Sequence, residues 1–364
     1  MAGVQLRTIQ SRLTRRSDAL VQAVGVIFKN LYTQQIQCRD RFCNDLEECC
    51  AASNDFVRMS DKCEEIVQEI QDECNLSPAS AESLEEQTAA LLNLYSGDAV
   101  YAAQKTHIYC FEPIEEELNE ELFSQEWLDE LTHNESALTL VRTLDDFMAD
   151  LETFLDEVMV QKTVEAQITA SIIFYLKMLV KKSAEHKSRT SAFSDNERAL
   201  QRMRGDMQTI REYFEGQSES MPTLNRVIER EFKLFEAAIE IMAIAAGISN
   251  SDVQDFIFVL QKSIRNVAIT KYVVGDLYHL VDPTVEHKIY ELIDGMEDDL
   301  LAVAPQAPAA GRSTVPGLRI DQAMAKHIEE TDRNRPLQAG TRERAEAALK
   351  SWRIAWGGGD AGGN

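Results

Sequence analysis

The chain has 364 residues, with 61 acidic and 37 basic side chains, which gives a formal net charge of −24. Phosphate backbones are bound by clustered Lys and Arg, so this balance excludes a nucleic-acid binder that works by whole-chain attraction. Hydrophobic residues make up 44% of the chain, enough for a sizeable core, and the length predicts about two domains. The 16 Gly and 8 Pro are too few for a turn-rich β fold or a disordered chain, so we expect an acidic all-α protein.

The N-terminal segment is basic, with four arginines and no acid within residues 1–17. Such a segment is typical of an organelle transit peptide. We favour the alternative of a basic helix end, because the segment continues into apolar residues at helical spacing: Leu20, Val24, Ile27 and Leu31. Further along, the most apolar stretch, 237–246, is interrupted by Glu240, and no uninterrupted apolar run reaches the ~18 to 20 residues of a membrane span.

All seven cysteines lie in the first third of the chain: Cys38, Cys43, Cys49, Cys50, Cys63, Cys74 and Cys110. An odd number of cysteines, without a secretory signal, predicts free thiols in a reducing compartment such as the cytoplasm. Their spacing does not match the paired Cys-x-x-Cys pattern of zinc sites. We therefore expect small buried thiols on helices and no metal site.

Apolar residues recur with helical spacing along most of the chain. One long helix is predicted by Val160, Val164, Ile168, Ile172, Tyr175 and Leu179. A second is predicted by Ile228, Phe232, Phe235, Ile239, Met242 and Ala246, ending where Gly247 adopts a left-handed cap conformation. A third is predicted by Val253, Leu260, Ile264 and Val267. No segment shows the period-two alternation and tight turns of paired strands.

Helix starts are marked by capping residues. Ser77 precedes Pro78, and Asp282 precedes Pro283, so each pair places an oxygen acceptor at the cap and a proline in the first turn. Ser194 and Glu197 form a capping-box pattern, and the helix they open is expected to end at Gly216. Near the C-terminus, three prolines and two glycines within 302–317 predict a linker.

Charge is distributed unevenly along the chain. Residues 112–157 hold 16 Asp and Glu and one basic residue, Arg142, whereas 162–213 hold ten Lys and Arg and six acids. Helices joined by short loops pack antiparallel, so the two segments are expected to lie side by side and partly neutralise each other. The alternative is that the acidic segment is a docking surface for a basic partner.

One segment, LDDFMAD, has the acidic spacing of a catalytic motif. Asp145, Asp146 and Asp150 lie one helical turn apart, as in the clusters with which all-α isoprenoid synthases hold Mg²⁺ and a diphosphate. The required second cluster is poorly formed, because its acids flank Gly295 near a helix end: Asp294, Glu297, Asp298 and Asp299. The six histidines are isolated, and no phosphate-binding glycine loop occurs. We therefore nominate no catalytic, cofactor-binding or metal-binding residue, and interpret LDDFMAD as a solvated helix face.

The order of several segments resembles the C-terminal half of the Sec-six family of exocyst subunits, which belong to the complex that tethers secretory vesicles to the plasma membrane. The first, 114–128, carries a Leu-Phe-x-x-x-Trp-Leu pattern at Leu122, Phe123, Trp127 and Leu128. The others are TLVRTLDDFMADL (139–151), IIFYLKMLVKK (172–182), FSDNERALQRMRGDMQTIREYFEG (193–216) and VAITKYVVGDLYHL (267–280). The resemblance covers 112–300, with a weaker extension over CCAASNDFVRMSDKCEEI (49–66).

The resemblance implies an elongated all-α rod of stacked antiparallel helical bundles. It also implies a non-enzymatic role in exocytosis, with contacts to other exocyst subunits and SNARE proteins and a peripheral association with the plasma membrane. On this basis we expect an N-terminal helical region (1–110), a Sec-six-like bundle domain (111–303), and a linker and tail with room for a short helix (304–364). The family's N-terminal coiled-coil region has no counterpart here, which suggests a truncated or divergent member.

Two other functions remain open from the sequence. The first is the Mg²⁺-dependent isoprenoid synthase suggested by LDDFMAD. The second is a stand-alone membrane-remodelling relative of the same fold, which would bind anionic lipids through basic patches at 7–16 or within 162–213. Neither function involves nucleic acid, and the preferred tethering function involves no small-molecule substrate or cofactor.

Overall fold

The computed structural model describes residues 17–129, 134–185, 190–253, 255–256 and 277–282. Within these ranges the secondary structure is helical and contains no strand, which confirms the all-α prediction. The helices are α2 (Ser17–Phe42), α3 (Leu46–Glu73), α4 (Pro78–Leu118), α5 (Gln125–Asp129), α6 (Glu135–Phe154), α7 (Glu157–Glu185), α8 (Asn196–Gln217) and α9 (Leu224–Ala245).

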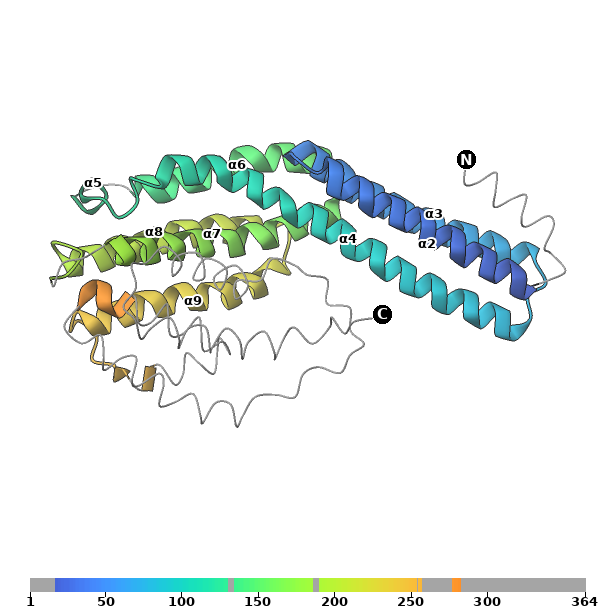
Figure 1. The fold of residues 1–364 in the computed structure, drawn as a ribbon. Helices are drawn as coiled ribbons and strands as arrows, with labels where there is room; N and C mark the ends of the chain where they lie inside the picture. Colours follow the sequence, from blue (N-terminus) through green and yellow to red (C-terminus); the bar gives the residue numbers. More distant parts are fainter. Residues whose placement is uncertain (1–16, 130–133, 186–189, 254, 257–276, 283–364) are drawn as a thin grey trace, which may run out of the picture.

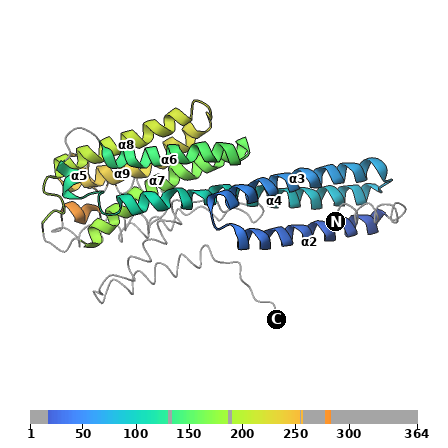
Figure 2. The ribbon, with the colours of Figure 1, turned by 90° about the horizontal axis from the view of Figure 1, so that it is seen from above.

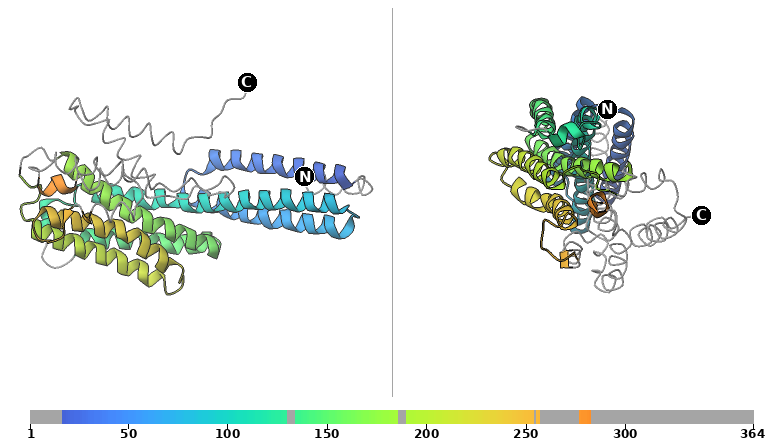
Figure 3. Two further views of the ribbon diagram at one scale, coloured as in Figure 1. Left: turned by 90° about the horizontal axis from the view of Figure 1, so that it is seen from below. Right: turned by 90° about the vertical axis from the view of Figure 1, so that its left-hand side faces the viewer.

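The helices form two bundles that share α4 (Figure 1). The first bundle contains α2, α3 and the first half of α4, and the second contains α6 to α9 with the second half of α4. Views from above and below show the bundles end to end along α4, with consecutive long helices running antiparallel (Figures 2 and 3). This arrangement confirms the predicted elongated rod of stacked antiparallel bundles.

Helix α4 carries a buried face through both bundles. It has 41 residues, and at a rise of 1.5 Å per residue it is ~60 Å long. Large side chains fill the core up to Tyr95 and again from Phe111 on, whereas the buried residues at 97–103 are small: Gly97, Ala99, Ala102 and Ala103. Small residues let neighbouring helices approach closely, and this is where the two bundles meet.

Two hydroxyl groups tie the neighbouring helices to the middle of α4. Ser53 Oγ of α3 donates to the Ala99 carbonyl oxygen at 2.9 Å. Thr163 Oγ1 of α7 donates to the Ala103 carbonyl oxygen at 3.0 Å. All four residues are buried, so each contact satisfies a polar group that would otherwise be desolvated without a partner. We call these four residues the α4 junction.

A third link joins the bundles beside the α4 junction. The Asn54 side chain of α3 donates to the Phe154 carbonyl oxygen at 2.6 Å. Its oxygen accepts from the Asp156 backbone N–H at 3.1 Å. One amide group therefore binds both the end of α6 and the start of α7, and it fixes the α6–α7 turn against the first bundle.

Both long helices predicted from apolar spacing are confirmed. The six residues that predict the helix at 160–179 are all buried in α7. By length and composition, 157–183 would suffice to cross a membrane, but 89% of the most apolar window is buried inside the protein, as in a core helix. Helix α9 ends at Ala245, and Gly247 follows with φ of 68°, the left-handed conformation expected there.

The cap predictions have different outcomes. Ser77 caps α4 as predicted, and its hydroxyl accepts from the Ser80 backbone N–H at 3.2 Å. The capping box at Ser194 is wrong, because α8 starts one residue later and is capped by Asp195. The Asp195 carboxylate accepts from the Arg198 N–H at 3.0 Å.

The residues next to this cap, and the far end of α8, also differ from the prediction. The Ser194 hydroxyl donates to Gln125 Oε1 at 3.4 Å, so it joins the loop to α5 and does not cap α8. The helix also continues through Gly216 to Gln217, because the position of Gly216 does not require a left-handed conformation.

Several predictions fall outside the described residues: the basic segment 1–16, most of the third helix (253–267), the Asp282–Pro283 cap beyond Asp282, and the linker and tail after 302. The division at 110, 303 and 304 stays a prediction. Helix α4 runs continuously across residues 110 and 111. The apolar residues from Leu20 to Leu31, which predict a helix near the N-terminus, lie in α2.

We predict that Ala103→Leu lowers the free energy of unfolding by about 1–3 kcal/mol, because the added carbons must displace α7 from a fully packed position. The measurement is urea unfolding followed by circular dichroism. Ala89→Leu, on an exposed position of the same helix, is the matched control and should change stability by less than about 0.5 kcal/mol. Equal effects of the two substitutions would contradict the tight packing of the junction.

Candidate functional site

The residues that carry the family resemblance at 122–128 lie in the core. Leu122, Phe123, Trp127 and Leu128 are all buried. The Phe123 ring packs edge-on against Trp127 and Tyr175, with ring centroids 5.0 and 5.1 Å away. Phe123 has φ of 66°, and its carbonyl oxygen accepts from Lys182 Nζ at 3.0 Å, which helps to hold this left-handed turn.

A buried carboxylate, Asp206 of α8, organises this aromatic cluster. Its Oδ2 accepts from Trp127 Nε1 at 3.0 Å and from the Tyr175 hydroxyl at 2.7 Å. Asp206 is fully buried, and the Arg202 guanidinium lies 5.8 Å from the Trp127 ring. Burial, followed by the charge of Asp206, raises the pKa of Tyr175 well above its usual range. One carboxylate thus connects α5, α7 and α8.

This cluster is a structural centre, since its polar groups face one another inside the protein. Sequence reasoning did not identify Asp206 as its organiser. A signal was present, because Asp206 lies between Met203 and Ile210 on the buried face of α8, where an apolar residue is expected. A charged residue is buried on such a face only when polar partners compensate for its loss of hydration, as the Trp127 and Tyr175 donors do here.

We predict that Asp206→Ala lowers the free energy of unfolding by about 3 kcal/mol or more, because the indole and phenol donors lose their buried acceptor. Asp206→Asn keeps one acceptor oxygen and should lose clearly less. Thermal unfolding by calorimetry measures both. The exposed Asp145→Ala is the control and should leave stability nearly unchanged; a loss as large as that of Asp206→Ala would overturn the assignment.

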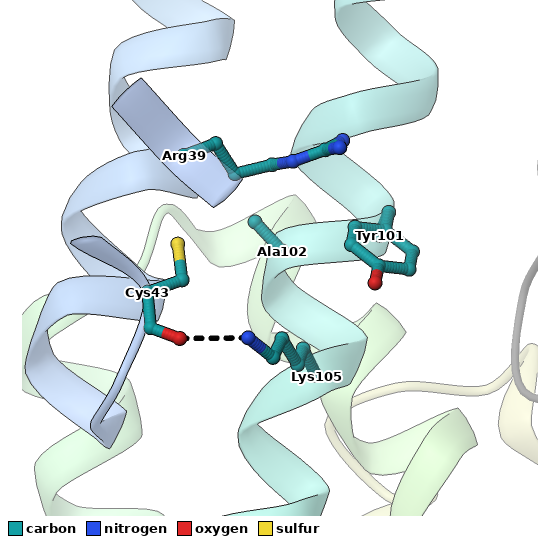
Figure 4. A pocket seen from close by; sticks show the side chains of 5 residues that line it. All are labelled: Arg39, Cys43, Tyr101, Ala102 and Lys105. Carbon is teal, nitrogen blue, oxygen red and sulfur yellow. Dashed lines mark hydrogen bonds between the residues drawn. The ribbon is translucent and has the colours of Figure 1, made fainter. Parts of the chain in front are cut away.

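A small pocket of about 200 Å³ lies where α2 ends beside α4. It is lined by Arg39, Cys43, Tyr101, Ala102 and Lys105 (Figure 4). Lys105 Nζ donates to the Cys43 carbonyl oxygen at 2.7 Å, and the Arg39 guanidinium lies 4.8 Å from the Tyr101 ring centroid. Arg39 also pairs with Asp98, and both groups are largely shielded from solvent.

Cys43, which lines this pocket, is the cysteine whose thiol has a lowered pKa. A hydrogen bond with Cys49 lowers the Cys43 pKa to about 7, and the charges of Lys105 and Arg39 act in the same direction against the opposing effect of burial. The shared hydrogen bond raises the pKa of Cys49. Burial also raises the pKa of Cys50 and of Cys63 to about 11. The thiolate is the nucleophilic form, so these thiols should differ sharply in reactivity.

We predict that alkylation of Cys43 by iodoacetamide rises with a midpoint near pH 7, because deprotonation produces the reactive thiolate. Pulse labelling between pH 5 and 9, read peptide by peptide by mass spectrometry, measures this. Cys49→Ala removes the hydrogen bond and should raise the midpoint, whereas Cys63→Ala should not. A midpoint above about 8.5 in the unmodified chain would contradict the lowered pKa.

All seven cysteines are free thiols, and all except Cys38 are buried. Asp145, Asp146 and Asp150 are exposed on α6, and the second acidic cluster at 294–299 lies outside the described residues. Among the residues that the structure describes, no three His, Cys, Asp or Glu side chains are grouped to hold a metal ion.

The acidic and basic segments lie side by side in part. Helix α6, from the acidic segment, packs along α8 from the basic segment (Figure 2). Arg198 lies 3.8 Å from the Asp129 carboxylate and also donates to its backbone oxygen at 2.8 Å. Most carboxylates of the acidic segment, including Glu115, Glu116 and Glu117 on α4, face solvent. Both interpretations of this segment therefore retain support.

Comparisons with known proteins give one family and one fold. A family model described as the exocyst complex component Sec6 matches residues 2–263. A crystal structure of the C-terminal domain of the exocyst subunit Sec6p superposes with a TM-score of 0.65 at 13% identity, over 85% of this chain and 81% of that one. At this identity the likeness concerns the fold alone. None of the curated proteins matches the sequence.

The family match covers residues 2–263, whereas the resemblance seen in the sequence covers 112–300 with a weaker extension over 49–66. The family match thus extends the resemblance towards the N-terminus. The match therefore takes in α2, α3 and the whole of α4 as well as the second bundle.

Proposed function

This chain belongs to the Sec6 family of exocyst subunits, and from that premise we propose that it helps to tether secretory vesicles to the plasma membrane before SNARE-mediated fusion. It would act by binding other exocyst subunits and SNARE proteins, in the cytoplasm and at the inner face of the plasma membrane. The observation that carries this proposal is the family match over 2–263, which includes every helix from α2 to α9.

The shape of the molecule supports action through surfaces. Its long helices expose extended faces along both bundles (Figure 3), and such faces suit recognition of partner helices. The α2–α4 pocket, at about 200 Å³, is below the ~300–1,000 Å³ of typical small-molecule sites. We propose that the chain acts through these helix faces, and we nominate no catalytic, cofactor-binding or metal-binding residue.

We predict that the tagged full chain recovers other exocyst subunits from native cytosol. The measurement is affinity purification read by mass spectrometry. Asp206→Ala serves as the matched variant, because a loss of folding should remove every partner contact, and the exposed Asp145→Ala should retain them. A folded chain that recovers no exocyst subunit would overturn the proposed function.

The same preparation tests the finer steps of the proposal. Purified plasma-membrane SNARE proteins should co-elute with the chain in size-exclusion chromatography. Phosphatidylserine liposomes, added without partners, test the stand-alone membrane-remodelling function, since basic patches bind anionic lipid directly. Strong liposome binding together with no exocyst subunit would favour that alternative over tethering.

A further inference from the structure

Helix α4 exposes three large apolar side chains in a line. Leu94, Tyr101 and Ile108 are 44%, 37% and 49% exposed. They are seven residues apart, so they lie on one face of the helix, which is the spacing at which coiled-coil helices contact a partner. From Leu94 to Ile108 this face extends ~21 Å, at a rise of 1.5 Å per residue. We call these three residues the α4 stripe.

Polar groups border the α4 stripe on the side of α2. The Arg39 guanidinium contacts the Tyr101 ring (Figure 4). It also pairs with Asp98, one turn away on α4. Lys105 follows Tyr101 by one turn, and its ammonium group donates a hydrogen bond to the Cys43 carbonyl oxygen. Apolar side chains bordered by engaged polar groups resemble the core and rim of a protein interface.

The charge of α4 indicates what kind of helix fits the stripe. The helix contains eight carboxylates and one ammonium, that of Lys105, a net of −7. Exposed carboxylates flank the stripe at both ends: Glu86 before Leu94, and Glu112, Glu115 and Glu116 after Ile108. Positive side chains on a partner would complement both ends, and would raise the association rate.

We propose that the α4 stripe binds an amphipathic helix of a partner subunit, with apolar residues at heptad spacing and Lys or Arg at both ends. This inference rests on the proposed function, since it supplies the partner class for a tethering subunit. A second copy of the chain fits the stripe poorly, because its own α4, also of net charge −7, would repel the first. The chain's own residues 318–364, with eight basic and seven acidic side chains, offer little complementary charge.

The first test replaces two members of the stripe in the full chain. The double variant Leu94→Gln, Ile108→Gln keeps good helix formers but removes the apolar contact. We expect recovery of at least one exocyst subunit to fall tenfold or more. The matched control, Val158→Gln with Ile248→Gln, removes two comparably exposed apolar side chains elsewhere and should keep recovery within twofold. Equal recovery with both double variants would overturn the inference.

The second test identifies the occupant. Tyr101 is replaced by photoreactive p-benzoylphenylalanine, the assembled complex is irradiated, and the crosslinked peptides are sequenced. A crosslinked helix of another subunit, with heptad apolar residues and basic ends, supports the proposal. Crosslinks to this chain's own tail or to a second copy, or no crosslink, overturn it.

The two levels of inference fail in different ways. If the unmodified chain recovers no exocyst subunit, the proposed function is wrong. If the unmodified chain and the stripe variant recover the same subunits equally, the function stands and the stripe inference is wrong. Raising the salt concentration should weaken the contact through the flanking carboxylates, and Glu112→Gln with Glu115→Gln should reduce this salt dependence.

Discussion

The continuity of α4 is the constraint on which the rest of the structure depends. A single helix of 41 residues supplies core to both bundles, so the register of the first bundle fixes that of the second. The small residues at its middle make this sharing possible, because α3 and α7 both reach its backbone there. A rod built in this way resists bending at the junction, since any bend would separate packed side chains on one side of α4.

Buried polar groups give this helical core its specificity. Apolar helix faces tolerate many pairings, whereas hydrogen bonds to single atoms do not. The Asp206 carboxylate requires two donors from different helices, and Asn54 binds the end of α6 and the start of α7 together. The motif residues that suggested the family therefore define the fold, and they leave partner recognition to other surfaces.

The sequence predicted the elements with strong apolar periodicity and missed those whose signal is weak. Helices α7 and α9 follow from large apolar residues spaced by three or four. The continuity of α4 across residue 110 was not recognised, because Gly97, Ala99 and Ala103 are buried yet contribute little apolar signal. The α8 cap was misplaced by one residue, because Ser194 and Asp195 are both good caps and the contact with Gln125 selects between them.

Surface function is harder to predict for a physical reason. Leu94, Tyr101 and Ile108 recur with a spacing that also occurs in core helices, so their exposure is known only once the neighbouring helices are placed. A fold similar to that of Sec6p at 13% identity shows that bundle packing accommodates extensive sequence change. Partner surfaces change with the partner, whereas a core must keep its packing and its few buried hydrogen bonds. The exposed face of α4, with its acidic ends, is therefore where this chain's own recognition chemistry is most readily separated from the chemistry that folds it.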